Sequence, residues 1–105
     1  VAGKGPDMIL AANDNLAQGA IQALEEESVT DMPVITGQDN TATAQANIKS
    51  HKQTMTIDKN LKDMAYNTAL IVNSLVSNSP VQASQSISGI PVFYSKITLM
   101  TIDSY

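Results

Sequence analysis

The sequence contains no cysteine and a single histidine among its 105 residues. The absence of thiols excludes disulfide bonds, thiol catalysis and zinc sites that use cysteine ligands. His51 has no carboxylate nearby at a ligand spacing, so we interpret it as a surface residue at the end of a helix, where a cation is favoured. No metal or other cofactor is therefore expected.

Basic residues are also scarce, with six Lys and Arg against ten Asp and Glu and a net charge of −4. Without a basic stripe, neither nucleic acid nor an anionic membrane surface is an expected partner. No apolar stretch reaches the roughly 20 residues that a membrane-spanning helix requires. Residues 1–4 lead into a strand-like run without the pattern of an export signal, which leaves the compartment open.

Hydrophobic residues make up 43% of the chain and charged residues 15%, so the chain can bury a core of the size of one small domain. Short apolar runs alternate with helical patterns. Strands are expected at 7–12, 32–36, 53–57 and within 90–102, helices at about 14–24, 41–50 and 60–77, and a polar loop at 78–89. This β-α-β-α-β-α-β order predicts an α/β fold, a parallel sheet with flanking helices.

Polar residues follow each of the first three predicted strands. In open α/β sheets, ligands bind beyond the carboxyl ends of the strands. This rule selects seven residues: Asn13, Asp14, Gln38, Asp39, Asn40, Asp58 and Lys59. Their chemistry suits a polyhydroxylated ligand, because a carboxylate accepts strong hydrogen bonds from hydroxyl groups and an amide both donates and accepts. The Lys59 ammonium, which only donates, could also pair with Asp39.

Each of these residues has a simpler explanation when it is taken alone. Asn13, Asp14, Asp39 and Asn40 are all suitable helix caps, and Lys59 could be a solvated residue before a helix. Only their coincidence at three strand ends favours a binding site. An enzyme is disfavoured, because no nucleophile with a positioned base, metal set or phosphate loop accompanies them. The three Tyr and one Phe come late in the chain and are expected to lie away from the strand ends.

Three segments carry a resemblance to a known family. Residues 11–24, AANDNLAQGAIQAL, resemble the strand–turn–helix of type I periplasmic sugar-binding proteins. Residues 33–39, PVITGQD, and 53–59, QTMTIDK, are most similar to the D-xylose-binding members that serve ABC transporters. The resemblance extends from about residue 7 to residue 103, and it implies that Asn13, Asp39 and Lys59 contact the sugar.

The resemblance also implies a role for the whole chain. Residues 1–105 would form the C-terminal portion of the second, sugar-binding lobe, and the rest of the same protein would supply the other contacts. The implied function is non-catalytic binding of a pentose, with D-xylose as the first candidate. The implied location is outside the cytoplasm. The sugar would be delivered to an ABC permease or reported to a membrane sensor histidine kinase. The alternative is the sugar-effector domain of a transcriptional repressor, which shares this fold.

Overall fold

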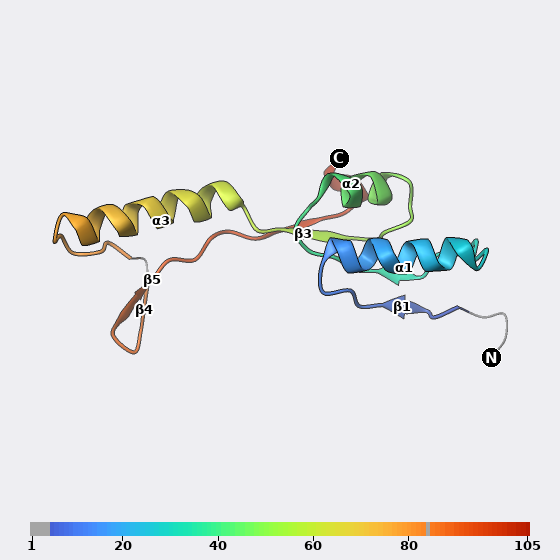
Figure 1. Ribbon diagram of the computed structural model, residues 1–105, viewed down its shortest axis with the longest axis horizontal. Coiled ribbons are helices and arrows are strands. Elements are labelled where there is room, and N and C mark those ends of the chain that lie inside the picture. The colour runs from blue at the N-terminus through green and yellow to red at the C-terminus, as the bar shows by residue number, and fades with distance from the viewer. Residues whose placement is uncertain (1–4, 84) are drawn as a thin grey trace. The chain divides into compact units, whose positions relative to one another are not determined.

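The computed structural model describes residues 5–83 and 85–105, which divide into two compact units (Figure 1). Of these residues, 5–59 and 98–105 form the first unit, and 60–83 and 85–97 form the second. Both are built from helices and short strands. Among the described residues, no helix has both the length and the apolar content that crossing a bilayer demands.

The first unit carries the β-α-β-α-β part of the predicted order, whereas the third predicted helix belongs to the second unit. Its elements are β1 (Met8–Ile9), α1 (Asp14–Glu26), β2 (Val34–Ile35), α2 (Ala42–Lys49), β3 (Thr56–Asp58), β6 (Thr98–Met100) and the 3-10 helix η1 (Ile102–Ser104). β1 and β2 pair in parallel, with Met8 opposite Val34 and Ile9 opposite Ile35. Helix α1 connects them, as expected of a crossover between parallel strands.

The last strand of the first unit runs in the opposite direction from the one expected. β6 pairs with β3 in antiparallel orientation, with Thr56 opposite Met100 and Asp58 opposite Thr98. A parallel partner would have to follow directly from a crossover helix, whereas β6 is entered from a segment that follows a hairpin. Consequently the carboxyl end of β6 lies beside the start of β3.

Helix starts agree with the sequence prediction to within about a residue. Asn13, Thr41 and Asn60 are the N-caps of α1, α2 and the later helix α3 (Leu61–Val76). In each case the side-chain oxygen accepts a hydrogen bond from the backbone N–H three residues on, at 2.9, 3.1 and 3.3 Å respectively. These bonds satisfy donors that the first turn of a helix leaves open.

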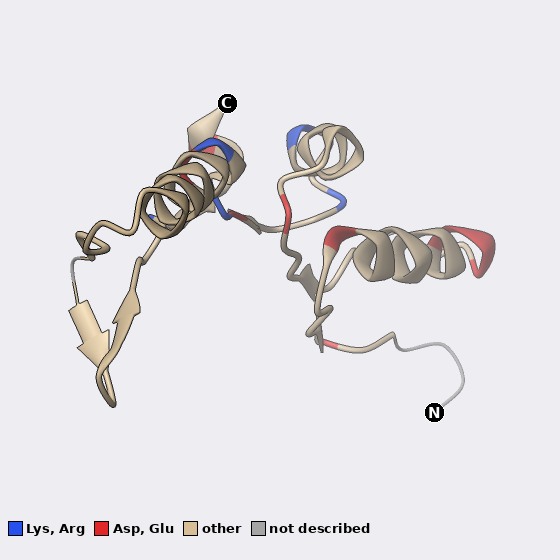
Figure 2. Ribbon diagram, turned by 60° about the vertical axis from the view of Figure 1, so that its left-hand side comes forward, with Lys and Arg blue, Asp and Glu red and all other residues tan. Residues whose placement is uncertain are grey.

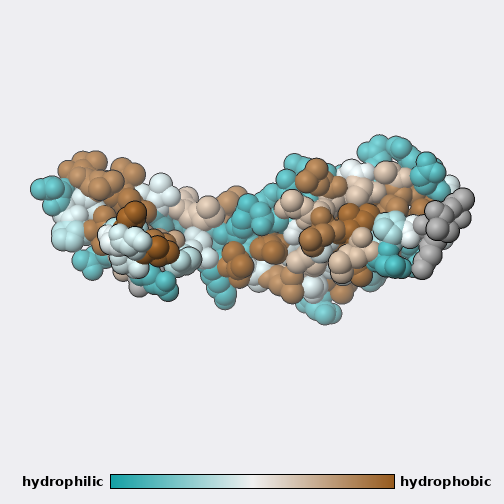
Figure 3. All heavy atoms as spheres, turned by 90° about the horizontal axis from the view of Figure 1, so that it is seen from below, coloured by the Kyte–Doolittle hydropathy of each residue, from teal (hydrophilic) through white to brown (hydrophobic). Residues whose placement is uncertain are grey.

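The core of the first unit is small. Ala17 and Ile21 of α1 pack with Ile35 of β2, and all three are at most 1% exposed. β1 was expected to be buried on both faces, but Met8 is 59% exposed and the following Leu10 is 83% exposed. The reason is that β1 packs against a helix on one face only. Figure 3 shows hydrophobic residues on the surface of this unit.

The second unit contains α3 and a hairpin formed by β4 (Gln85–Ile87) and β5 (Ile90–Val92). The segment 78–89 was expected to be a loop throughout, and β4 corrects that prediction. Ser88 and Gly89 form the two-residue turn, with φ angles of 52° and 79°. Positive φ at both positions is typical of the turn that best matches the twist of paired strands, which is why this Ser-Gly pair closes a hairpin.

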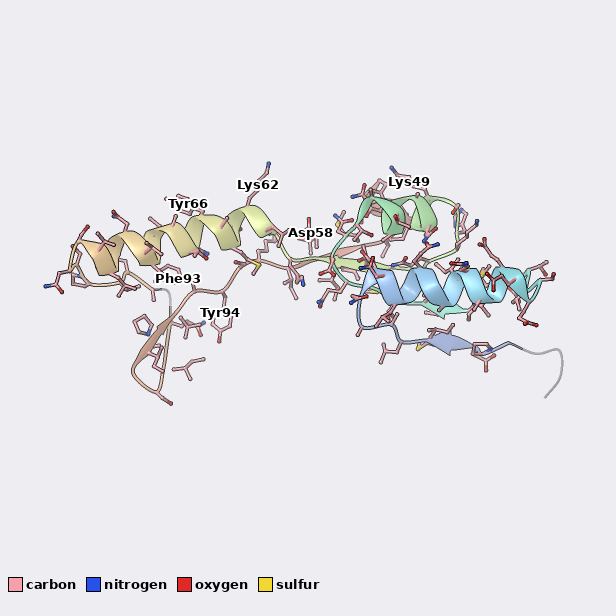
Figure 4. The ribbon with its side chains drawn as sticks, viewed as in Figure 1. Lys49, Asp58, Lys62, Tyr66, Phe93 and Tyr94 are labelled. Carbon is pink, nitrogen blue, oxygen red and sulfur yellow. The ribbon has the colours of Figure 1, made fainter. Side chains whose placement is uncertain are left out.

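α3 has apolar residues at helical spacing, among them Met64, Ile71 and Leu75, yet none of its residues is buried. A helix buries its apolar stripe only where another layer covers it. Here a hollow of about 170 Å³ is lined by Met64, Ile71 and Phe93 among others. Figure 4 labels Phe93 beside α3 and Tyr94 next to it; Tyr94 is 61% exposed. The second unit therefore holds little of the buried apolar surface.

Truncation of Ile21 to Ala should destabilise the first unit by about 2–5 kcal/mol, because it leaves a cavity in the cluster that joins α1 to β2. The matched control is Leu16→Ala in the same helix, where the side chain is 59% exposed, and it should cost less than about 1 kcal/mol. Urea denaturation followed by circular dichroism measures both. Equal losses of stability in the two variants would contradict this account of the core.

Candidate functional site

The turns that follow β1 and β2 and the end of β3 are joined by backbone hydrogen bonds. The N–H of Asp14 donates to the carbonyl of Gln38 at 2.9 Å, and the N–H of Asp39 donates to the carbonyl of Ile57 at 2.9 Å. The polar residues at the three strand ends are therefore neighbours. This is the convergence that the strand-end rule predicted.

The carboxylate of Asp14 lies at the centre of this arrangement and is only 2% exposed. Its Oδ1 accepts hydrogen bonds from the Thr56 hydroxyl at 2.7 Å and the Gln53 amide at 3.1 Å. Its Oδ2 accepts from the backbone N–H of Thr41 at 2.8 Å. Three donors from two other segments thus satisfy the buried carboxylate. Asp14 thereby holds the turns together.

Gly37 makes this approach possible. A Cβ atom at this position would lie 2.2 Å from Oδ1 of Asp14 and 2.4 Å from Nε2 of Gln53. Both distances are far shorter than any van der Waals contact. Gly37 is buried and does not have a positive φ, so the requirement for glycine here is purely one of space.

Asp39 and Lys59 form an ion pair, with Nζ 2.6 Å from Oδ1. Their side chains are 40% and 37% exposed, which distinguishes this carboxylate from that of Asp14. An exposed ion pair contributes at most about 1 kcal/mol to stability. Both groups are accessible to a ligand, and together they offer acceptors and donors at one point.

Asn13 is half-buried, and its side-chain oxygen caps α1. No contact in the described part of the chain joins it directly to the Asp39–Lys59 pair. The neighbouring Asp14, through its bond to Gln38, places the two turns side by side. The structure thus brings two of the three predicted site residues into contact and sets the third on the adjacent turn.

Tyr105 reaches the same turns, contrary to the prediction that the aromatic residues lie away from the strand ends. Its hydroxyl donates a hydrogen bond to Oδ1 of Asn40 at 2.5 Å, and the Lys49 ammonium lies 4.9 Å from the ring centroid. Burial, and then the negative charges of Asp14 and Asp58, raise the pKa of the Tyr105 phenol. No sequence pattern could have found this contact, which spans 65 positions and depends on the direction of β6.

A separate hollow of the first unit lies elsewhere. It has a volume of about 760 Å³ and is lined by residues that precede β1 and β2, including Asp7 and Asp31. The candidate site residues follow those strands, so the hollow is at the opposite end of the pair. Figure 2 shows acidic residues at both ends of α1, but no cluster of metal-ligating side chains occurs in the described ranges. His51 is exposed just beyond α2, as predicted.

Comparisons of the sequence identify relatives. The family model of the periplasmic binding protein domain matches residues 2–80. The D-xylose-binding periplasmic protein of Haemophilus influenzae is 34% identical over 82 residues, which are 78% of this chain and 25% of that protein. The chain thus spans about a quarter of the length of this curated relative.

Solved structures share the fold. A solute-binding protein of an ABC transporter from Clostridium phytofermentans, with bound β-D-glucose, matches with a TM-score of 0.86 and 23% identity over 99% of this chain and 34% of that one. A periplasmic solute-binding protein from Actinobacillus succinogenes, with bound D-allose, gives a TM-score of 0.74 and 22% identity over 93% and 32%. These likenesses confirm the predicted fold class.

Replacement of Gly37 by Ala should destabilise the protein by about 1–3 kcal/mol, because the added methyl group must displace Asp14 or Gln53 from their bonds. Gly19→Ala is the matched control, since a Cβ added there would have nothing within 4 Å and Ala favours the helix interior. Thermal denaturation should rank Gly37→Ala below the parent and Gly19→Ala at or above it. The reverse order would refute the crowding argument.

The stability of the fold should fall at alkaline pH through Tyr105. The folded state holds the phenol proton more tightly than the unfolded chain, because the pKa is raised in the fold. Stability is therefore unaffected below the ordinary tyrosine pKa of about 10 and decreases as the pH rises from there through the raised value. Urea denaturation from pH ~8 to ~11.5 should show a shallower alkaline decline in Tyr105→Phe. An identical decline in both proteins would contradict the assignment.

Proposed function

Because the chain belongs to the family of periplasmic binding protein domains, we propose that it contributes one wall of a reversible, non-catalytic sugar-binding site. Asn13, Asp39 and Lys59 are the proposed contacts. The accessible Asp39–Lys59 pair carries the proposal, since it is exposed at the strand ends while the neighbouring carboxylate is wholly used by the scaffold.

The chemistry of the pair fits a polyhydroxylated ligand. A sugar hydroxyl can donate to a carboxylate and accept from an ammonium at the same time, which makes both hydrogen bonds charge-assisted. The 2.6 Å contact between Lys59 and Asp39 holds both groups at one place before the sugar arrives. Such pre-organisation lowers the entropic cost of binding.

Asn13 complements the pair. Its Oδ1 is engaged by the first turn of α1, which fixes the side chain and leaves the amide NH₂ as the group to donate to a sugar oxygen. Asp14 is not proposed as a contact, because its two oxygens already accept three hydrogen bonds within the fold. The division separates the adjacent residues of one turn into a ligand contact and a structural anchor.

D-xylose is the proposed ligand. The first support is the 34% identity to a protein named for binding D-xylose. The second is the segment QTMTIDK, which ends in Lys59 and resembles the D-xylose-binding members of the family. Structural neighbours hold D-allose or D-glucose, which are hexoses. A panel of these three sugars therefore tests whether the site is fitted to a pentose.

The proposed location is outside the cytoplasm. There the protein would serve as a substrate-binding protein for an ABC transporter or would report the sugar to a membrane sensor kinase. The chain spans about a third of the solved relatives, so the other wall of the pocket is proposed to come from the rest of the protein. Lobe closure on the sugar would be the signal that either partner reads. Sugar uptake assays and a sugar-responsive transcription reporter in a deletion strain separate the two uses.

Asp39→Asn and Lys59→Met should each weaken D-xylose binding by about 10- to 150-fold, because each removes a charge-assisted hydrogen bond worth about 1.5–3 kcal/mol. Isothermal titration calorimetry of the full-length protein against D-xylose, D-glucose and D-allose measures the effect. Asp31→Asn and Lys62→Met serve as controls, since both residues are exposed and neither belongs to the candidate site.

Unchanged affinity in both site variants would refute the site assignment. Tighter binding of either hexose than of D-xylose would refute the pentose assignment and leave sugar binding in place. Chemical turnover of any of the three sugars would overturn the non-catalytic role.

A further inference from the structure

The turn that carries Asp39 has an unusual backbone. Asp39 and Asn40 both have positive φ angles, 108° and 54°. Such angles are uncommon for residues with side chains, although Asp and Asn tolerate them better than most. Because the surrounding structure must hold such residues in place, the contacts of this turn decide where the Asp39 carboxylate lies.

Four hydrogen bonds hold the turn. Two come from its own N–H groups, that of Asp39 to the Ile57 carbonyl at 2.9 Å and that of Asn40 to the Thr56 hydroxyl at 3.2 Å. A third is donated by the Gln45 amide to the Asn40 carbonyl at 3.2 Å. The fourth holds the Asn40 side chain, which accepts from the Tyr105 hydroxyl at 2.5 Å.

Tyr105 is itself well placed to act on the turn. It follows η1, at whose start the Thr101 N–H donates to the Ser104 hydroxyl at 3.0 Å. The Lys49 ammonium lies 4.9 Å from the ring centroid, at a distance where a cation is attracted to the face of an aromatic ring. The ring is thus held by α2 while its hydroxyl holds Asn40.

We propose that Tyr105 is a positioning residue of the sugar site, which fixes the Asp39–Asn40 turn through the Asn40 side chain and so keeps the Asp39 carboxylate beside Lys59. The inference rests on the proposed function, in which Asp39 accepts hydrogen bonds from the sugar. Tyr105 itself does not touch the ligand. Its hydroxyl acts through a residue adjacent to the one that binds.

Tyr105→Phe removes only the hydroxyl and retains the ring that lies under Lys49. The loss of one hydrogen bond to the turn should weaken D-xylose binding by about two- to tenfold. Amide hydrogen exchange at Asp39 and Asn40, measured by NMR, should accelerate several-fold. Exchange at the core residue Ile21 should stay as in the parent, whereas a general loss of stability would accelerate all three. Tyr94→Phe, a change at an exposed tyrosine of the second unit, is the matched control.

A double-mutant cycle tests whether the effect passes through Asn40. Asn40→Gly removes the side chain that Tyr105 holds but permits the positive φ and keeps the N–H that bonds to Thr56. In this background, Tyr105→Phe should change the affinity by less than about twofold. A full effect of Tyr105→Phe in the Asn40→Gly protein, or unchanged exchange at Asn40 in the single variant, would overturn the proposal.

The exchange measurement does not require a ligand. If the parent protein binds no sugar of the panel, the proposed function fails, and the exchange at Asp39 and Asn40 still decides whether Tyr105 positions the turn. If the parent binds D-xylose and Tyr105→Phe alters neither affinity nor exchange, the positioning role alone is refuted.

Discussion

The buried carboxylate of Asp14 is the interaction on which the arrangement of the first unit depends. It accepts hydrogen bonds from the hydroxyl of Thr56, the amide of Gln53 and the backbone of Thr41, all at 3.1 Å or less. A charge that is 2% exposed must be satisfied by such donors or cost several kcal/mol. The segments that provide them are therefore fixed relative to α1. With a core of only a few apolar side chains in this unit, the polar centre specifies how the strand ends meet, since an apolar contact has no directional requirement.

Asp14 and Asp39 lie on neighbouring turns and differ in their surroundings because they differ in burial. Asp14 is enclosed and saturated, and Asp39 is 40% exposed at its side chain and paired with a single ammonium. Gly37 allows both arrangements. Because it has no side chain, Gln53 and Asp14 can form their hydrogen bond next to it, while Asp39, two residues on, stays exposed. A carboxylate that serves both the fold and a ligand would have to exchange hydrogen bonds on binding. In the proposed site, separation of the two carboxylates would let a ligand bind and leave without a loss of the contacts that define the turns.

Much of the first unit could be predicted from local chemistry, and the rest depended on contacts distant in sequence. The cap Asn13 was recognisable because the interactions of a helix end span only a few residues, whereas α2 is capped by Thr41 and not by Asp39 or Asn40, the residues suggested for it. The strand-end rule located the Asp39–Lys59 pair because it requires only the order of the elements. It could not distinguish Asp14 as a buried anchor, since burial depends on Thr56 and Gln53 from a different segment. Nor could it give the direction of β6, because a β-rich run reads the same from either end.

The direction of β6 has a consequence for the site. Because Met100 lies opposite Thr56, the chain leaves β6 at the start of β3, where the Thr56 hydroxyl also accepts from the Asn40 N–H. A parallel strand would end beyond Asp58 and carry Tyr105 away from this turn. The antiparallel pairing therefore brings a residue 65 positions from Asn40 to within 2.5 Å of its side chain. Two residues with positive φ in succession cost on the order of 1–3 kcal/mol each, more than one net hydrogen bond supplies. Several hydrogen bonds from separate segments are needed to offset this conformational cost. The geometry of the Asp39 turn therefore depends on the whole unit.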